Sequence, residues 1–260
     1  MTERENITDI LCIGCQKGST SWLHSVLNCH RRTSAFPDSE PITSTSKEAH
    51  FWDRNHDRGI DWYRGLMEPS DPNNLTMDFT PEYAYMSDAE IAECKELNPS
   101  AKVIYILRDP LARALSTIRM RVLWHFGKSY DQTLKLDETF YSMVKHADLQ
   151  AHGDYVRNVT AWRKHYPDLV LFNYEDFHTD SRDSIGRLFE SLGLDVADLD
   201  PERRAKFEDL TSGGRVWASE PFPISRPALQ FLNGLTWRFR QEADTELSMR
   251  FTEGERMLQD

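Results

Sequence analysis

Residues 12–30 of the chain, CIGCQKGSTSWLHSVLNCH, decide the interpretation of the fold. They overlap a segment, ITDILCIG (Ile7 to Gly14), that is short, apolar, β-branched and closed by glycine, which predicts a buried strand. Trp22 to Leu27 then supports a helix. A strand, a glycine-bearing turn and a helix N-terminus direct several free backbone N–H groups toward one point, where the helix dipole adds partial positive charge. The sequence therefore predicts an anion site here.

Two later segments follow the same pattern. KVIYILRD (Lys102 to Asp109) and LVLFNYEDF (Leu169 to Phe177) predict buried strands, and helical spacing of apolar residues follows each of them, to about Val122 in the first case. Strands that alternate with helices predict an α/β chain with a P-loop-like three-layer fold, in which helices flank a mostly parallel central sheet. Ligands of such sheets bind at the carboxyl ends of the strands. Three segments are expected at that edge: Gly14 to Thr20, Arg108 to Ser116 and Tyr174 to Asp176.

Three other segments are less regular. Arg32 to Asp53 is polar and punctuated by proline, which predicts a surface loop that leads to a short ordered element. Arg119 to Phe140 either extends a helix or forms a substrate loop. Asp200 to Pro227 is rich in glycine and proline toward its end and is expected to be irregular, with a final helix from Pro227 to about Phe251.

Size and charge narrow the possible functions. With 260 residues, of which 39% are hydrophobic, the chain can bury a sizeable core, and we expect one domain over residues 1–260. The net charge of −11 argues against a general nucleic-acid or anionic-membrane binder, because such partners require a basic face. No secretory signal or spanning stretch of about 18 apolar residues is recognisable, so we expect a cytoplasmic location and no membrane partner. The oligomeric state is not predicted.

The cysteines carry a weak signal. Cys12 and Cys15 form a C-x-x-C, which is compatible with a redox pair or half of a zinc site. No second C-x-x-C and no histidine pair at finger spacing accompany it. Structural or incidental cysteines are the favoured interpretation.

The loop differs from the usual phosphate loop. That loop reads G-x-x-x-x-G-K-[ST], with a hydroxyl that holds magnesium. Here the order is Gly14-x-x-Lys17-Gly18-Ser19-Thr20-Ser21, so the lysine precedes the second glycine. No clear strand near the loop ends in a carboxylate that could bind magnesium. The loop is therefore poorly suited to metal-assisted phosphoryl transfer, and a donor that needs no metal fits better.

A second anion site is predicted at LRDPLARALS. Arg108 lies at a strand end, Pro110 near a helix start and Ser116 on a following turn, so that guanidinium and hydroxyl can bracket one phosphate. Arg113 fits a structural ion pair as well as a phosphate contact. Two separated anion sites on one sheet edge indicate a nucleotide phosphorylated at both ends of its ribose.

These motifs resemble a known family. CIGCQKGSTSWL together with YILRDPLARALS resembles the paired 5′- and 3′-phosphate motifs of sulfotransferases that use 3′-phosphoadenosine 5′-phosphosulfate (PAPS). KEAHFWDRNHDRGIDWYRGLM (Lys47 to Met67) resembles the K-E-x-H-F-F-D … G-x-x-W-Y segment of the heparan-sulfate-type branch. DFTPEYAY, GDYVRNVTAWRKHYPD and SGGRVWASEPFP resemble further segments of that branch, and together the matches cover roughly residues 10–250.

The resemblance implies a set of roles. Lys17 would contact the sulfate and the leaving phosphate oxygen, and Glu48 would be the general base. His50 and Asp53 would line the acceptor side. The remaining cofactor ligands implied are Gln16, Gly18, Ser19, Thr20 and Ser21 around the 5′-phosphosulfate, Arg108 and Ser116 at the 3′-phosphate, and Ser212, Gly213, Gly214 and Arg215 in a closing loop.

The sequence also departs from the family pattern. Gly213 stands where the family usually has lysine, and Asp78 with Phe79 replaces the usual Glu-Lys. The membrane anchor of the animal enzymes is not recognisable, which implies a soluble, microbial-type enzyme whose acceptor is a glycan or a small molecule. The aromatic and acidic residues near Glu48 favour an uncharged or cationic small molecule. The expected donor is PAPS, the expected by-product adenosine 3′,5′-bisphosphate (PAP), and no metal is required.

Two other functions remain open at this point. A nucleotide or small-molecule kinase would bind ATP and depend on magnesium, whereas a sulfotransferase binds PAP without metal. A non-catalytic nucleotide-binding protein would have no need of Lys17 and Glu48 together. Glu48 also has a purely structural alternative, an exposed pair with Lys47 or Arg54, and His50 has one as a packed imidazole.

Overall fold

The computed structural model describes residues 4–36, 47–127, 130, 132–145, 148–179, 181–212 and 222–259. Its centre is a five-stranded sheet in the order β2-β3-β1-β4-β5, and every neighbouring pair is parallel. The strands are β1 (Ile10–Cys12), β2 (Thr33–Ser34), β3 (Leu75–Asp78), β4 (Lys102–Leu107) and β5 (Val170–Asn173). The three predicted strands are confirmed, although the third ends early, because Tyr174 already begins a helix. β2 and β3 were not predicted.

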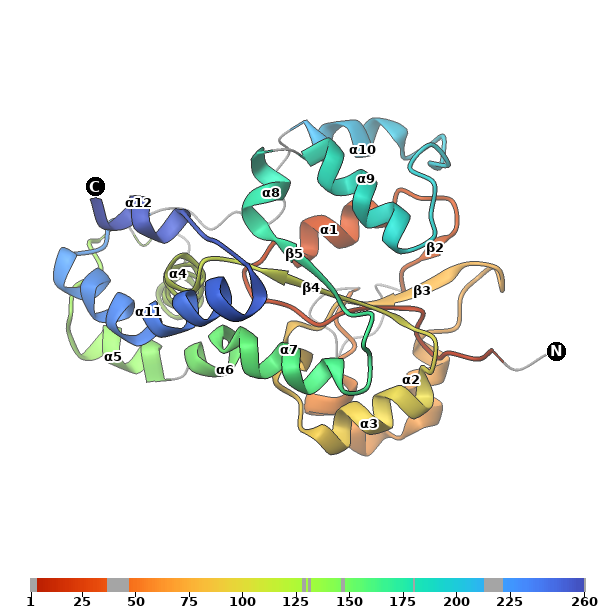
Figure 1. Cartoon of the computed structure of the whole chain (residues 1–260), viewed down its shortest axis with the longest axis horizontal. Helices are drawn as coiled ribbons and strands as arrows, with labels where there is room; N and C mark the ends of the chain where they lie inside the picture. The colour runs from red at the N-terminus through yellow and green to blue at the C-terminus, as the bar shows by residue number, and fades with distance from the viewer. Residues whose placement is uncertain are drawn as a thin grey trace.

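Helices cover both faces of the sheet (Figure 1). One face carries α1 (Thr20–Leu27), α8 (Tyr174–Thr179), α9 (Ser181–Ser191) and α10 (Arg204–Thr211). The other carries α2 (Ile60–Leu66), α3 (Asp88–Leu97), α6 (Leu149–Gly153) and α7 (Tyr155–Arg163), with the short turns η1 (Phe51–Asn55), η2 (His56–Arg58) and η3 (Pro81–Tyr85). This arrangement confirms the predicted three-layer α/β fold.

The residues of β4 explain why both faces must be covered. Val103, Tyr105 and Leu107 belong to one buried cluster, and Ile104 and Ile106 belong to the other. Side chains alternate across a strand, so a continuous apolar run fills two cores at once. Burying β4 between two helical layers is therefore dictated by its sequence.

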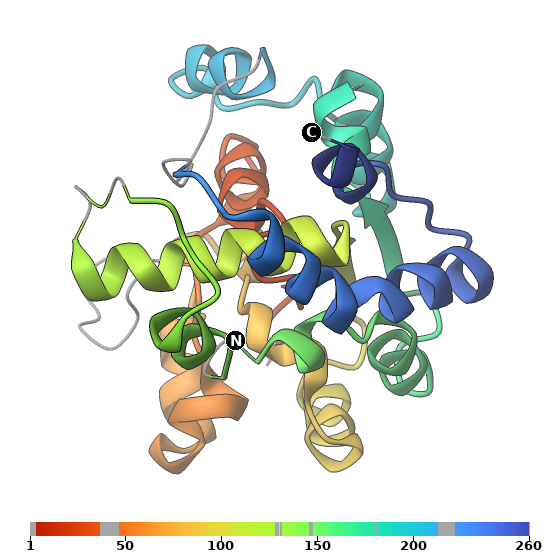
Figure 2. The same ribbon diagram turned by 90° about the vertical axis from the view of Figure 1, so that its left-hand side faces the viewer.

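A third group of helices lies beyond the carboxyl ends of the strands. It consists of α4 (Pro110–Phe126), α5 (Glu138–Lys145), α11 (Arg226–Leu247) and α12 (Glu253–Gln259). Asp109 caps α4 by accepting from the backbone N–H groups of Leu111 and Ala112, and Pro110 occupies the first turn, where its missing N–H costs nothing. Figure 2 shows α11 running across α4, with α12 near α8.

Two sequence predictions for the C-terminal part need correction. The stretch from Asp200 to Pro227 is not wholly irregular, since it contains α10. The final helix, predicted from Pro227 to about Phe251, runs from Arg226 to Leu247 and is followed by α12. Of the stretch from Arg119 to Phe140, the described part shows α4 continuing to Phe126, which favours a helix extension over a loop at its start.

The four cysteines are free and buried, which agrees with structural roles rather than a redox pair. Among the described helices, none combines the length and the apolar character needed to cross a bilayer.

Candidate active site

The loop between β1 and α1 is a tight backbone turn at the carboxyl end of the sheet. The N–H of Cys15 donates to the carbonyl of Ile106 at 2.8 Å, and the N–H of Gly18 donates to the carbonyl of Cys15 at 2.9 Å. Lys17 and Ser19 both have a φ of 66°, in the left-handed region. A Cβ on Gly18 would lie 2.8 Å from Cys15 Sγ, so glycine is required by the close approach of the chain. The turn delivers the first N–H groups of α1 to its concave side.

Three cationic side chains converge on this loop. Burial lowers the pKa of Lys17, and the charges of Arg108 and Lys47 lower it further. Arg108 follows β4, and Lys47 lies in the segment before η1. The positive electrostatic potential at the loop therefore depends on residues that only the folded chain brings together. An anion at this place would relieve their mutual repulsion.

Arg108 lies at the end of β4, next to the loop. Its NH1 group donates to the carbonyl of Lys17 at 2.9 Å, and its guanidinium lies 4.2 Å from the ring centre of Tyr174. Its Nε and NH2 groups donate to the two carboxylate oxygens of Glu253, at 2.9 and 2.5 Å. Ser116 lies half-buried on α4, the helix that starts just after Arg108.

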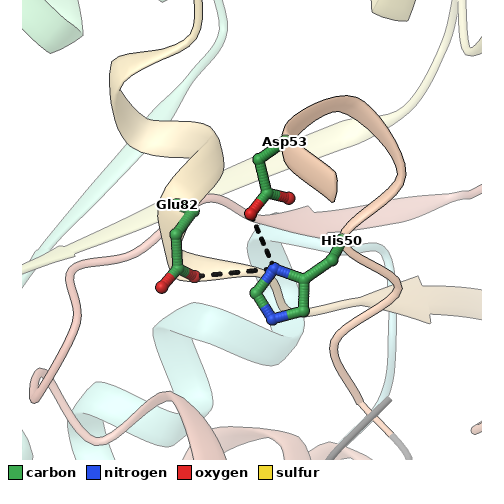
Figure 3. Close-up of side chains that lie close together, drawn as sticks. All are labelled: His50, Asp53 and Glu82. Carbon is green, nitrogen blue, oxygen red and sulfur yellow. Dashed lines mark hydrogen bonds and ion pairs between the residues drawn. The ribbon is translucent and has the colours of Figure 1, made fainter. Parts of the chain in front are cut away.

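Glu48 and His50 form the other half of the site. Glu48 Oε1 contacts the ammonium group of Lys47, and Glu48 Oε2 lies 3.4 Å from His50 Nε2. His50 Nδ1 lies 2.8 Å from Asp53 and 3.9 Å from Glu82 (Figure 3). The imidazole is thus surrounded by three carboxylates.

The pKa shifts follow from these contacts. Burial alone would raise the pKa of Glu48, but the hydrogen bond from His50 and the charge of Lys47 outweigh it and lower the pKa to about 2. Burial alone would lower the pKa of His50, but its hydrogen bonds to Asp53 and Glu48 raise it to about 9. At neutral pH the site therefore holds an imidazolium beside the ionised carboxylate of Glu48, whereas burial raises the pKa of Glu82. His50, Asp53 and Glu82 also have the spacing of a metal-binding group.

A buried carboxylate holds the segment that carries these residues. Asp78, at the end of β3, accepts from the N–H of Ala49 at 3.2 Å and from Thr80 Oγ1 at 2.7 Å. It also accepts from the hydroxyls of Tyr63 and Tyr83, both at 3.0 Å. Asp78 is fully buried, so these bonds fix the backbone of residues 47–50 against the sheet.

Gln16 connects the two halves of the site. Its side-chain amide donates to Glu82 at 3.4 Å and accepts from Thr117 on α4 at 3.3 Å. The side chain predicted to cradle the cofactor thus reaches toward the acceptor side as well.

The structure brings most of the predicted site residues to one edge. The loop residues, Arg108 and the group Glu48, His50 and Asp53 lie around the carboxyl ends of β1, β3 and β4. Ser212 ends α10, exposed, with its hydroxyl bonded to the carbonyl of Asp209 at 3.1 Å. Gly213, Gly214 and Arg215 lie outside the described residues.

Two further side chains of the predicted motifs, Trp22 and Arg113, are buried. Trp22 donates from Nε1 to the carbonyl of Leu210 at 3.0 Å and packs edge-on against Phe177, so it belongs to the core. Arg113 is fully buried and donates to the carbonyl of Leu149 at 2.7 Å. Among the described residues it has no carboxylate partner, which argues against the structural ion pair, one of the two roles left open for it.

The sequence interpretation assigned no role to Glu82, Asp78 or Glu253. Asp78 stood out only as a departure from a family pattern, and Glu82 only as part of the DFTPEYAY segment. Glu253 carries no local signal, because its partner Arg108 is 145 positions away.

The fold and these groups define a class of protein: an α/β nucleotide-binding transferase with a cationic loop on one side and an ionised carboxylate on the other. Residues 7–212 match the family described as "Sulfotransferase domain", and the chain belongs to that family. Membership confirms the predicted family and the predicted class of enzyme, the sulfotransferases, a family that takes the sulfuryl group from PAPS and yields PAP.

Similar proteins support the same conclusion. The chain is 28% identical over 199 residues to human heparan sulfate glucosamine 3-O-sulfotransferase 3B1, an alignment that covers 73% of this chain and 47% of that protein. Mouse heparan sulfate glucosamine 3-O-sulfotransferase 6 is also 28% identical over 199 residues, with 74% and 54% covered. The chain spans about half the length of the curated relatives it matches.

Solved structures confirm the fold. A sulfotransferase from Alicyclobacillus acidocaldarius superposes with a TM-score of 0.67 at 16% identity, covering 95% of this chain and 98% of that one. Mouse sulfotransferase SULT7A1 complexed with PAP gives a TM-score of 0.50 at 16% identity, covering 99% and 88%.

Proposed function

We propose that the chain moves the sulfuryl group of PAPS to a hydroxyl or amine of a small-molecule or glycan acceptor by in-line transfer, with Glu48 as general base and Lys17 stabilising the leaving phosphate. The observation that carries this proposal is the link between the two halves of the site. Gln16 follows Cys15 in the phosphate loop, yet its side chain reaches Glu82, which lies beside His50 and Glu48. Donor loop and acceptor carboxylates therefore border one space.

The donor half suits an anionic nucleotide. The N–H groups at the start of α1 and the ammonium of Lys17 can receive the 5′-phosphosulfate. Arg108, joined to the carbonyl of Lys17, can receive the 3′-phosphate together with Ser116. As the sulfur leaves the phosphate oxygen, negative charge grows on that oxygen, and the half-buried Lys17 stabilises it more than a solvated amine would.

The acceptor half suits proton removal. The acceptor oxygen or nitrogen forms a bond to sulfur, the bond from sulfur to the phosphate oxygen breaks, and the acceptor proton passes to Glu48. A carboxylate with a pKa of about 2 is a weak base, so Glu48 needs to lose part of its stabilisation first. Lys47 can cause this loss, because it pairs with Glu48 and lies close enough to Lys17 to influence its pKa. A bound anionic donor would attract the Lys47 ammonium and so draw it away from Glu48.

The acceptor class follows from charge. Glu48, Asp53 and Glu82 surround His50 on the acceptor side, and the net charge of the chain is −11. This supports an uncharged or cationic acceptor, such as a natural product, over a polyanionic glycan. The named relatives act on heparan sulfate, so a glycan acceptor is the competing proposal.

We also propose that residues 1–260 act as one domain in the cytoplasm. α11 and α12 lie beyond the matched residues 7–212, yet both contact α4, which carries Ser116. Limited proteolysis that released a stable fragment without α11 would contradict the single domain, and cell fractionation tests the location.

The activity test uses labelled PAPS with a panel of amines, alcohols and heparan-type oligosaccharides, read as sulfated mass shifts. Glu48→Gln is expected to lower turnover by roughly a hundredfold or more while PAP binding stays within about threefold of wild type. Glu68→Gln, an exposed carboxylate, is the matched control and should change neither. Near-normal turnover of Glu48→Gln would exclude Glu48 as the base. Stabilisation by ATP and magnesium, but not by PAP alone, would favour a kinase instead.

A further inference from the structure

The proposed 3′-phosphate ligand already holds an anion that belongs to the chain itself. Arg108 donates from Nε and NH2 to both carboxylate oxygens of Glu253, and its NH1 is used by the carbonyl of Lys17. The Arg108 side chain is only 14% exposed, and its guanidinium lies over the ring of Tyr174. A carboxylate and a phosphate bind the side-on fork of arginine through the same two N–H groups. Glu253 therefore occupies the position that the fork offers to a phosphate.

The backbone around Glu253 shows that this pairing is built into the fold. Glu175, at the start of α8, accepts from the N–H groups of Thr252 and Glu253, at 2.7 and 3.0 Å. Asn173, at the end of β5, donates to the carbonyl of Arg250 at 2.9 Å. The end of β5 and the start of α8 thus hold the start of α12 through hydrogen bonds. Figure 2 shows α12 near α8.

The next residue fixes α12 from the other side. Gly254 is buried against the ion pair between Asp109 and Arg240, in which Arg240 Nε donates to Asp109 at 2.9 Å. A Cβ on Gly254 would lie 2.3 Å from Asp109 Oδ1 and 2.5 Å from the Arg240 guanidinium. The helix can approach this closely only because residue 254 is glycine. Glu253 is thereby presented to Arg108, the neighbour of Asp109.

We infer that Glu253 is an internal anion that competes with the 3′-phosphate of PAPS and PAP for Arg108 and so sets the affinity of the site for its nucleotide. The inference rests on the proposed role of Arg108 as 3′-phosphate ligand. When the nucleotide binds, the carboxylate leaves the fork and turns toward solvent; when PAP dissociates, it returns. Even a phosphate that approached Arg108 beside the fork would meet the like charge of Glu253. The carboxylate thus favours release of the bisphosphate product.

The test compares nucleotides that differ only in the 3′-phosphate. Dissociation constants of PAP and of 5′-AMP are measured by calorimetry for wild type, Glu253→Gln and Glu255→Gln. Glu255 is an exposed carboxylate on the same helix, so its variant has the same charge change without the contact to Arg108. Glu253→Gln is expected to bind PAP roughly tenfold more tightly, with 5′-AMP affinity unchanged. Glu255→Gln should match wild type for both ligands.

Three outcomes would overturn the inference. They are unchanged or weaker PAP binding by Glu253→Gln, an equal gain for 5′-AMP, and an equal gain in Glu255→Gln. If Glu253→Gln does not fold, Glu253→Ala replaces it, because it removes the competing carboxylate altogether; it too must bind PAP more tightly than wild type. If wild type and Glu253→Gln both fail to bind PAP, the proposed function fails together with this inference. Equal, tight PAP binding by both would remove only the role of Glu253.

Discussion

The guanidinium of Arg108 donates to the main-chain oxygen of Lys17 at 2.9 Å, so the two predicted anion sites are joined by one hydrogen bond. Lys17 has a φ of 66°, and the bond from Arg108 helps to hold its carbonyl in that turn. The 5′ and 3′ ends of a nucleotide would therefore be read by a single connected unit rather than by two independent patches.

Replacing Arg108 by lysine keeps the charge but removes the fork and the bond to the loop. We expect Arg108→Lys to weaken PAP binding by roughly ten- to a hundredfold, because an ammonium cannot bind phosphate side-on and reach Lys17 at the same time. Calorimetric titration measures this change. Arg163→Lys, on an exposed face of α7, is the control and should leave PAP affinity unchanged. Equal affinity of Arg108→Lys and wild type would show that Arg108 does not bind the 3′-phosphate.

The variant Gly18→Ala tests whether PAP binding depends on the tight turn of the phosphate loop. A Cβ at this position would lie 2.8 Å from Cys15 Sγ and 2.9 Å from the Cys15 carbonyl, so part of the loop has to move in Gly18→Ala. We expect PAP affinity to fall by roughly tenfold or more, in line with a cost of about 1–3 kcal/mol for an overpacked site. Gly186→Ala is the matched control, since nothing lies within 4 Å of its added Cβ in α9. That variant should bind PAP normally and gain a little stability. Identical PAP titrations for the two variants would contradict the role of Gly18.

The variant Asp78→Ala tests whether the hydrogen bonds of this carboxylate hold the segment that carries Glu48 and His50. Asp78→Ala removes the carboxylate that accepts from the buried hydroxyls of Tyr63 and Tyr83, and the N–H of Ala49 loses its partner as well. We expect a loss of about 3 kcal/mol in the free energy of unfolding, measured by urea denaturation. Asp57→Ala removes an exposed carboxylate and is expected to stay within about 0.5 kcal/mol of wild type. Similar midpoints for both variants would mean that the Asp78 bonds do not hold the segment.

The strands that could be predicted from the sequence are those whose buried side chains are mostly apolar. β1, β4 and β5 are continuous hydrophobic runs, and the sequence identifies them. β3 was not predicted because two of the buried residues of LTMD, Thr76 and Asp78, are polar. Hydrogen bonds rather than apolar packing stabilise them in the interior. β2 has only two residues and makes its contacts through β3.

The site divides in a similar way. Lys17, Arg108 and Glu48 could be predicted as site residues because each lies in a short motif next to a strand end or in a recognisable segment. The hydrogen bonds to Asp78 come from Tyr63 and Tyr83, which lie on separate elements. The pairing of Glu253 with Arg108 joins residues that are far apart in the sequence. Local spacing contains no information about contacts of this kind.

His50 makes the stability of the protein depend on pH in a defined window. Its pKa rises from 6.5 unfolded to about 9 folded, because Asp53, Glu48 and Glu82 surround the imidazolium. A raised folded pKa contributes stability that is fully present below about 6.5 and is lost as the pH rises through about 9. We expect wild type to lose on the order of 2 kcal/mol more than His50→Gln between pH 6.5 and 9.5, measured by urea denaturation. His125→Gln, which removes an exposed histidine, should keep the wild-type slope. Parallel stability curves for wild type and His50→Gln would contradict the imidazolium, and with it the depressed basicity of Glu48 in the resting site.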